Sequence, residues 1–266
     1  MTAQDVANHL NGLDGGWVHW EETVDTFTAG DPARAVTAIA VGWKAHTWAL
    51  KRAYELGCDL FVCHEPLYYH LPDVPTDEGL HAEGVLAKER WLAETGMTVL
   101  RCHDVWDQVP GIGIPDSWGA ALGFSNPLPK SRGYYRAYDV TGSTAGDVAR
   151  RVAERVKCLG QEAVLFLGDP DKPVTTIVIG TGAITPVYHY DFVRRFNADI
   201  VICTDDGFHW CCWGGYATDI GLPVIVVNHC TAEEPGIVSL AAHLRATFAG
   251  TPVHHIAQGA QYRLIH

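Results

Sequence analysis

Four short segments of the chain place histidine and carboxylate side chains directly after apolar runs. They are His64-Glu65-Pro66, residues 103–107, residues 204–209 and residues 228–234. An apolar run that stops at such side chains is typical of a buried strand in an open α/β sheet, which presents its chemistry at the carboxyl end. Buried ionisable groups are costly unless they are paired or bind a cation. The pattern therefore predicts a metal site with imidazole and carboxylate ligands, suited to Zn, Fe, Mn or Co, as one ion or a pair.

Two of these segments also have a spacing that suits a helical turn. His103 and Asp107 are four residues apart, and so are His229 and Glu233. On one turn of helix such pairs share a face. Each segment alone is equally compatible with an ordinary polar turn or an exposed ion pair, and Glu233 or Glu234 with an acid favoured by a helix dipole.

Composition limits the classes of function. The chain has 266 residues, of which 47% are hydrophobic and 19% charged, with a net charge of −12. This length allows one large domain or two small ones. A surface this acidic argues against nucleic-acid binding, which needs a basic face, and favours cationic ligands such as metal ions.

The N-terminal sequence and the cysteines bear on the compartment. Residues 1–18 lack the basic and apolar regions of a signal peptide, and no apolar run reaches the ~18 residues that span a bilayer. We therefore expect a cytoplasmic protein that does not associate with membranes. The eight cysteines include no Cys-x-x-Cys pair, which argues against a zinc ribbon or a redox dithiol and favours reduced, packed thiols.

Hydrophobic periodicity predicts a first α/β lobe over residues 1–128. Strands are expected at residues 36–43, 60–63 and 97–102, and helices at 3–12, 46–56, 81–95 and 116–122. Thr2 is the expected N-cap of the first helix. Residues 13–33 are expected to be irregular and residues 71–80 to form a polar loop. Strand, helix and strand joined by short links form a parallel pair.

A second α/β lobe is predicted over residues 129–266, after a stretch rich in Pro, Lys, Ser and Gly. Strands are expected at 134–140, 163–167, 175–179, 199–203, 223–227 and 251–256, and helices at 143–159, 186–196, 209–219 and 237–248. Thr185 is the expected cap of the second of these helices. The last helix and strand can pack back on the first lobe. The predicted fold class is thus α/β, with two lobes of mostly parallel sheets flanked by helices.

Three of the motifs, in this order, resemble those of the NIF-three-like family (NGG-one interacting factor three) of dinuclear metal centre proteins. They are His64-Glu65-Pro66, His103-Asp-Val-Trp-Asp107 and His229-Cys-Thr-Ala-Glu233. In the family the corresponding motifs are His-His-Pro, His-x-x-x-Asp and a His-x-x-Ser/Thr/Ala-Glu that opens the last helix. The match covers nearly the whole length. It departs from the family at Glu65, which replaces a histidine, and at Asn228, which replaces a glycine.

The resemblance implies a site for two divalent metal ions between the lobes, at the carboxyl ends of the strands. The implied ligands are His64, Glu65, His103, Asp107, His229 and Glu233, with Glu233 bridging the two ions. A carboxylate at position 65 would favour Fe or Mn, or leave one metal position weak.

The resemblance also implies a metal-dependent hydrolase of unknown small-molecule substrate, with an activity like that of GTP cyclohydrolase as one possibility, and assembly into a homo-hexamer. The sequence adds little support for a nucleotide, because it has no P-loop and only a weak Gly180-Thr181-Gly182 signal. Two alternatives stay open: a non-catalytic metal-handling or regulatory protein, and an interaction protein with a vestigial site.

Overall fold

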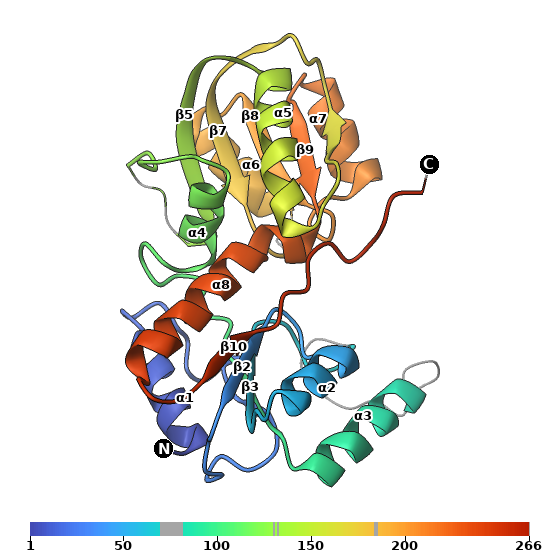
Figure 1. Ribbon diagram of the computed structural model, residues 1–266. Coiled ribbons are helices and arrows are strands. Elements are labelled where there is room, and N and C mark those ends of the chain that lie inside the picture. The colour runs from blue at the N-terminus through green and yellow to red at the C-terminus, as the bar shows by residue number, and fades with distance from the viewer. Residues whose placement is uncertain (70–81, 130, 132, 184–185, 266) are drawn as a thin grey trace. The chain divides into compact units, whose positions relative to one another are not determined.

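The computed structural model describes residues 1–69, 82–129, 131, 133–183 and 186–265. The chain forms two compact units, residues 1–109 with 237–257 and residues 110–236 with 258–266. Each unit contains one five-stranded sheet with helices packed on it (Figure 1).

The sheet of the first unit has the order β1 (Phe27–Ala29), β4 (Thr98–Arg101), β3 (Leu60–Cys63), β2 (Ile39–Gly42) and β10 (Val253–His255). All neighbouring pairs are parallel except β1 with β4. The helices are α1 (Ala3–Asn11), α2 (Thr47–Glu55) and α3 (Ala82–Thr95). Every residue of β2, β3 and β4 is buried, as in a parallel sheet that is covered on both faces.

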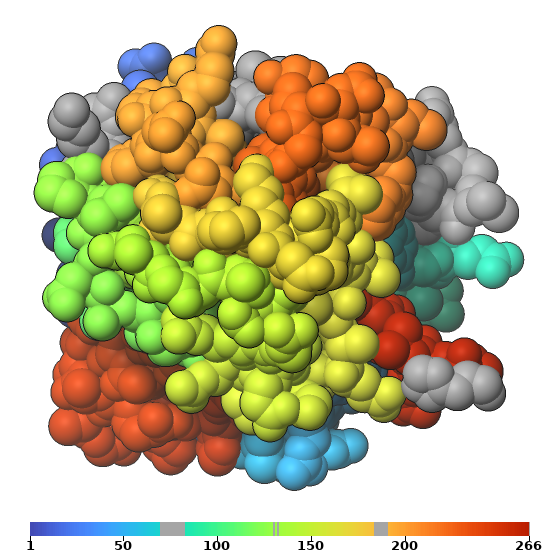
Figure 2. Space-filling model, turned by 90° about the horizontal axis from the view of Figure 1, so that it is seen from above, coloured from blue at the N-terminus to red at the C-terminus, as the bar shows by residue number. Residues whose placement is uncertain are grey.

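The sheet of the second unit has the order β5 (Tyr135–Thr144), β7 (Pro173–Gly180), β8 (Ile200–Thr204), β9 (Val224–Val227) and β6 (Leu165–Leu167). β7, β8 and β9 are parallel, and both edge strands are antiparallel to their neighbours. Its helices are α4 (Ile114–Ala121), α5 (Ala145–Val156), α6 (Pro186–Phe196) and α7 (Gly215–Asp219). α5 and the segment that follows it occupy the middle of the face in Figure 2, in yellow-green to yellow.

Local sequence explains why α1 and α5 begin where they do. The Thr2 and Thr144 hydroxyls accept hydrogen bonds from the backbone N–H of Asp5 and Asp147, and these aspartates return a bond to the backbone of the cap. Such capping boxes satisfy the free donors at a helix start. Val148, Val152 and Val156 then bury one face of α5 in the core of the second unit.

The predicted α/β class with two sheets flanked by helices is confirmed, and two details differ from expectation. The stretch 13–33, expected to be irregular, contains the short edge strand β1. The helix expected at 209–219 begins with a π-helical turn, Trp210–Gly214, before α7.

The predicted boundary at 128/129 lies inside the second unit. Residues 110–128 include α4, whose Trp118 packs in the same core cluster as Tyr138 and Val148. The C-terminal segment 237–257, which holds β10, belongs to the first unit. The N-cap Thr185, the helix start at His81 and the loop 71–80 lie outside the described residues.

The last long helix was predicted to begin at Ile237, and this prediction is wrong. Helix α8 spans His229–Thr247 and contains Pro235, which lacks the N–H for one intrahelical hydrogen bond. Its first turn is stabilised from outside: the Asp205 carboxylate accepts the backbone N–H of His229 at 2.8 Å and the Asn228 side-chain amide at 2.9 Å. The favourable interaction of the Asp205 carboxylate with the amino end of α8 compensates for the intrahelical hydrogen bond that Pro235 cannot make.

The helices and the cysteines of the described residues have two further properties. None of the helices there is long and apolar enough to cross a bilayer. All eight cysteines are free, and five of them are buried: Cys58, Cys63, Cys102, Cys203 and Cys230.

Candidate metal centre

The adjacent strands β3 and β4 bring three predicted ligands together in the first unit. His64 follows β3 and His103 follows β4 by two residues, and Cys63 is in register with Arg101 across the parallel pair. The two imidazole rings stack with their centroids 4.4 Å apart. One ligand atom from each of His64, His103 and Asp107 lies within 4.8 Å of the other two.

A single helical turn positions two of these side chains. The backbone N–H of Asp107 donates to the His103 carbonyl at 2.9 Å, which places both side chains on one face. His103 Nδ1 lies 3.2 Å from Asp107 Oδ2 and 2.9 Å from Asp104 Oδ1. The predicted four-residue spacing therefore acts here as a turn that aims imidazole and carboxylate at the same point.

The buried side chain of Asp25 holds the start of this turn, and sequence reasoning missed it. Its carboxylate accepts the backbone N–H groups of His103, Asp104 and Val105 at 2.5, 2.9 and 2.8 Å. Burial raises the pKa of Asp25 although these bonds oppose the rise. No local sequence signal marks the residue, because its partners lie far away in the chain.

The orientation of His64 suits a cation. Its Nδ1 lies 3.2 Å from the carbonyl oxygen of Cys102, which can only accept, so Nδ1 carries the proton. In the neutral ring, Nε2 then presents a lone pair to Asp107 Oδ1 at 3.5 Å. A proton on Nε2 or a metal ion beside both atoms balances this arrangement. A backbone carbonyl that accepts the N–H of the other ring nitrogen is a usual outer partner of a metal-bound histidine.

His103 holds a proton strongly in the metal-free arrangement. Burial lowers its pKa, but the carboxylates of Asp107, Asp104 and Glu65 outweigh burial and raise the pKa to about 9. This excess of negative charge around one imidazole attracts a cation, either a proton or a metal ion.

Two lysines fix the loop that carries Glu65. Lys44 Nζ donates to the backbone carbonyls of Pro66 and Tyr68 at 2.6 and 3.0 Å. The buried Lys88 Nζ donates to the backbone carbonyls of Ala45 and Leu67 at 2.9 and 2.6 Å. The Glu65 carboxylate is half-buried and close enough to act on the charge of His103. Ligation by Glu65 stays a prediction.

His229 and Glu233 meet in the second unit, in the first turns of α8. His229 Nε2 lies 3.0 Å from Glu233 Oε1, and His229 Nδ1 lies 2.8 Å from Asp206 Oδ2. Both α8 residues are buried, whereas Asp206 is exposed. Asp206 therefore orients the ring so that Nε2 faces Glu233, the outer-carboxylate arrangement common for metal-binding histidines. The bridging role of Glu233 stays a prediction.

Cys102, which precedes His103, is a poor ligand in the metal-free arrangement. Burial raises the pKa of Cys102 well above its usual value, and the carboxylates of Asp25 and Asp107 raise it further. A thiol must lose its proton to bind a metal, so this one stays protonated at neutral pH. The described cluster of His64, His103 and Asp107 offers imidazole and carboxylate donors.

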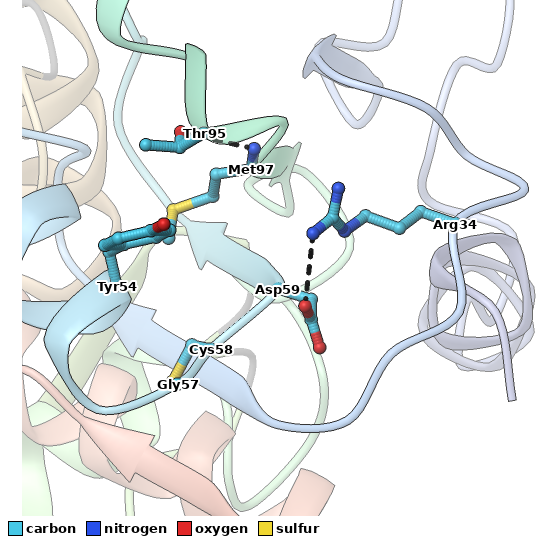
Figure 3. Close-up of a pocket in the computed structure, with 7 residues that line it drawn as sticks. All are labelled: Arg34, Tyr54, Gly57, Cys58, Asp59, Thr95 and Met97. Atoms are coloured by element: carbon cyan, nitrogen blue, oxygen red, sulfur yellow. Dashed lines mark hydrogen bonds and ion pairs between the residues drawn. The ribbon is translucent and has the colours of Figure 1, made fainter. Parts of the chain in front are cut away.

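A cavity of about 440 Å³ lies at the opposite end of the same strands. It is lined by residues that precede β3 and β4, among them Cys58, Asp59 and Met97, and Figure 3 shows Arg34 paired with Asp59 at 3.3 Å. Ligands of parallel sheets bind at the carboxyl ends of strands, and this cavity is at the amino ends. We therefore place the candidate site at His64 and His103.

Comparison with known proteins identifies relatives over nearly the whole chain. A family model described as Duf34/NIF3 (NGG1p interacting factor 3) matches residues 3–260. A Clostridium perfringens (strain 13 / Type A) protein named GTP cyclohydrolase 1 type 2 homolog is 22% identical over 258 residues, which cover 92% of each chain.

Solved structures share the fold. The structure of Staphylococcus aureus protein SA1388 superposes with a TM-score of 0.80 at 14% identity, covering 100% of this chain and 99% of that one. A structure of protein ybgI, described as of unknown function, gives a TM-score of 0.77 at 21% identity, covering 96% and 98%.

Proposed function

Because the chain belongs to the DUF34/NIF3 family, we propose that it binds two divalent metal ions and uses them to hydrolyse a small molecule. The proposed ligands are His64, Glu65, His103 and Asp107 in the first unit, and His229 and Glu233 in the second. The ions are Zn, Fe, Mn or Co, since these accept mixed imidazole and carboxylate ligands.

The observation that carries the proposal is the cluster of His64, His103 and Asp107. Its ligand atoms lie within 4.8 Å of one another, and His64 Nε2 faces Asp107 Oδ1 at 3.5 Å. Such a cluster at the carboxyl ends of buried parallel strands would be costly without a cation.

The six proposed ligands would hold the divalent ions, which would supply Lewis-acid activation of water and of a substrate oxygen. The protein's own residues position and tune the ligands. The Cys102 carbonyl keeps the proton of His64 on Nδ1, and Asp25 keeps the His103 turn in place. The proton of His103 has to leave before that ring can bind a metal, so metal binding releases protons to the buffer.

The substrate class we favour is a purine nucleotide such as GTP. Its support is the name of the Clostridium perfringens relative. The net charge of −12 repels a polyanion, and metal ions would offset that repulsion locally.

Metal analysis and titration test the binding half of the proposal. The purified protein is expected to hold two ions per chain, and Asp107→Ala to lose at least one of them. His19→Ala, which changes an exposed histidine elsewhere, is the control and should keep both. Equal metal content and affinity in Asp107→Ala and the unchanged protein would refute the assignment.

Turnover tests the catalytic half. Hydrolysis of GTP by the metal-loaded protein should disappear in Glu233→Ala, with the circular dichroism spectrum unchanged. Full metal binding without turnover of GTP, or of a panel of phosphate esters and amides, would instead favour the metal-handling alternative.

We also propose that the chain assembles with itself, as the hexamer expected from the family resemblance. Large exposed side chains such as Trp20, Trp48 and Trp210 are compatible with buried contacts between copies. Light scattering should give a mass about six times that of the chain, and a monomer mass would contradict the proposal.

A further inference from the structure

Two histidines from distant parts of the sequence face one another in the first unit, and neither is among the proposed ligands. His9 lies in the last turn of α1 and His243 lies in α8, and their Nε2 atoms are 2.8 Å apart. The rings are stacked, with centroids 5.1 Å apart and planes 21° from parallel. Both residues are half-buried, so the pair is ordered but within reach of solvent.

The surroundings of the pair favour a cation. His9 is near the carboxyl end of α1, and Thr247, the last residue of α8, has its hydroxyl 3.4 Å from His9 Nε2. The carboxyl ends of helices carry partial negative charge, which stabilises cations. Aromatic rings close the other sides: Phe248 is 5.4 Å from His9 and Trp106 is 5.5 Å from His243, between ring centroids.

We propose that His9 and His243 form a second kind of metal site, which binds a borderline divalent ion such as Cu²⁺ or Zn²⁺ through both Nε2 atoms and so ties α1 to α8. Imidazole suits these ions, and Cu²⁺ is bound more tightly than Zn²⁺ by a given set of nitrogen ligands. The Thr247 hydroxyl and water complete the coordination.

The distances fit this role with little movement. Metal–nitrogen bonds of about 2.0–2.1 Å at a roughly tetrahedral angle put two imidazole nitrogens about 3.3 Å apart. The rings would therefore separate by about half an ångström, which side-chain torsions on two helices can supply.

The proton balance is also simple. In the metal-free pair one ring donates its Nε2–H to the lone pair of the other. When a metal binds, the donating ring keeps one proton but carries it on Nδ1, so two neutral rings bind without net proton release. Burial and the neighbouring His9 lower the pKa of His243, which keeps this ring neutral and ready to bind near pH 7.

Titration with Cu²⁺ alone tests the proposal. The unchanged protein should bind one equivalent more than His9→Gln or His243→Gln, or bind it about 10–100-fold more tightly, since even an outer partner of a metal ligand contributes that much. Electron paramagnetic resonance of this equivalent should show coupling to imidazole nitrogen. Hydrogen exchange in α1 should slow on adding Zn²⁺, and this slowing should be absent in His243→Gln.

Matched variants separate this site from the proposed metal centre. Asp107→Ala should keep the extra equivalent, and His19→Gln should change nothing. Metal-free melting temperatures of the two histidine variants show whether a loss reflects misfolding. Unchanged Cu²⁺ stoichiometry and affinity in folded His9→Gln and His243→Gln would overturn the proposal, whatever happens at Asp107.

Discussion

At the scale of single residues, the candidate metal centre depends on which atom of each side chain is aimed inward. The Cys102 carbonyl selects Nε2 of His64, and the Asp206 carboxylate selects Nε2 of His229. These outer partners are a backbone carbonyl and an exposed aspartate. The carbonyl is backbone, which no sequence pattern marks. Asp206 lies in the polar segment 204–209, but the sequence does not show that it orients His229.

Asp25 gives the sharpest prediction at this scale. Asp25→Asn keeps the size of the side chain but replaces one accepting oxygen with an N–H donor that opposes the backbone N–H groups of residues 103–105. Metal affinity should fall by about 10–100-fold, the usual loss for an outer-shell change. Calorimetric titration measures it, with Asp31→Asn as a control on a turn remote from the ligands. Unchanged affinity in a folded Asp25→Asn protein would mean that Asp25 does not position the turn.

At the scale of elements, the buried parallel strands were predictable because each is a short, continuous apolar run that ends in polar residues. β2, β3, β8 and β9 lie within or near the predicted ranges. The edge strand β1 was missed because its residues are half-buried and its partner β4 is distant. The start of α8 was missed because Pro235 is typical of a helix break. Asp205, which stabilises the first turn of α8, follows β8 and is distant in the sequence.

A close backbone approach inside the second unit gives a prediction for α8. A Cβ at Gly236 would lie 2.8 Å from the Ile114 Cα and 2.5 Å from its Cδ1, so α8 and the start of α4 would have to separate. Gly236→Ala should destabilise the fold by about 1–3 kcal/mol, as overpacking does. Urea unfolding measures this. Gly215→Ala, where a Cβ meets nothing within 4 Å, should be neutral or slightly stabilising.

The ion pair between α4 and β5 gives a pH prediction. Arg136 Nε and Nη2 bind the two oxygens of Asp116 at 2.5 and 3.0 Å. Burial raises the pKa of Asp116, but the bonds from Arg136 outweigh it and hold the pKa below its usual value. The pair therefore stabilises the fold at neutral pH, and this contribution is lost as pH falls below the usual range of an aspartate.

Removing one partner of this pair should be costly. Asp116→Asn should lose about 3 kcal/mol at pH 7, because Arg136 is left buried. The difference from the unchanged protein should shrink at pH 3, measured by urea unfolding at both values. Arg150→Gln, which breaks an exposed pair with Asp147, should cost much less.

At the scale of the whole molecule, the proposed metal binding would be linked to folding. Each ion present at 100 times its dissociation constant stabilises the protein by about 2.7 kcal/mol. A chelator should thus lower the melting temperature by about 5–10 °C for each such ion. The shift should be smaller in Asp107→Ala, and calorimetry with and without chelator checks it. An equal shift in both proteins would place the stabilising metal elsewhere.

The positions of the cysteines allow the rate of local opening to be measured separately in each unit. Cys158, Cys211 and Cys212 are exposed, so a maleimide should modify them before it reaches the buried thiols. Cys58, Cys63 and Cys102 would then report the opening of the first unit, and Cys203 and Cys230 that of the second. Mass spectrometry of the labelled peptides over time would show whether the two units open together or independently.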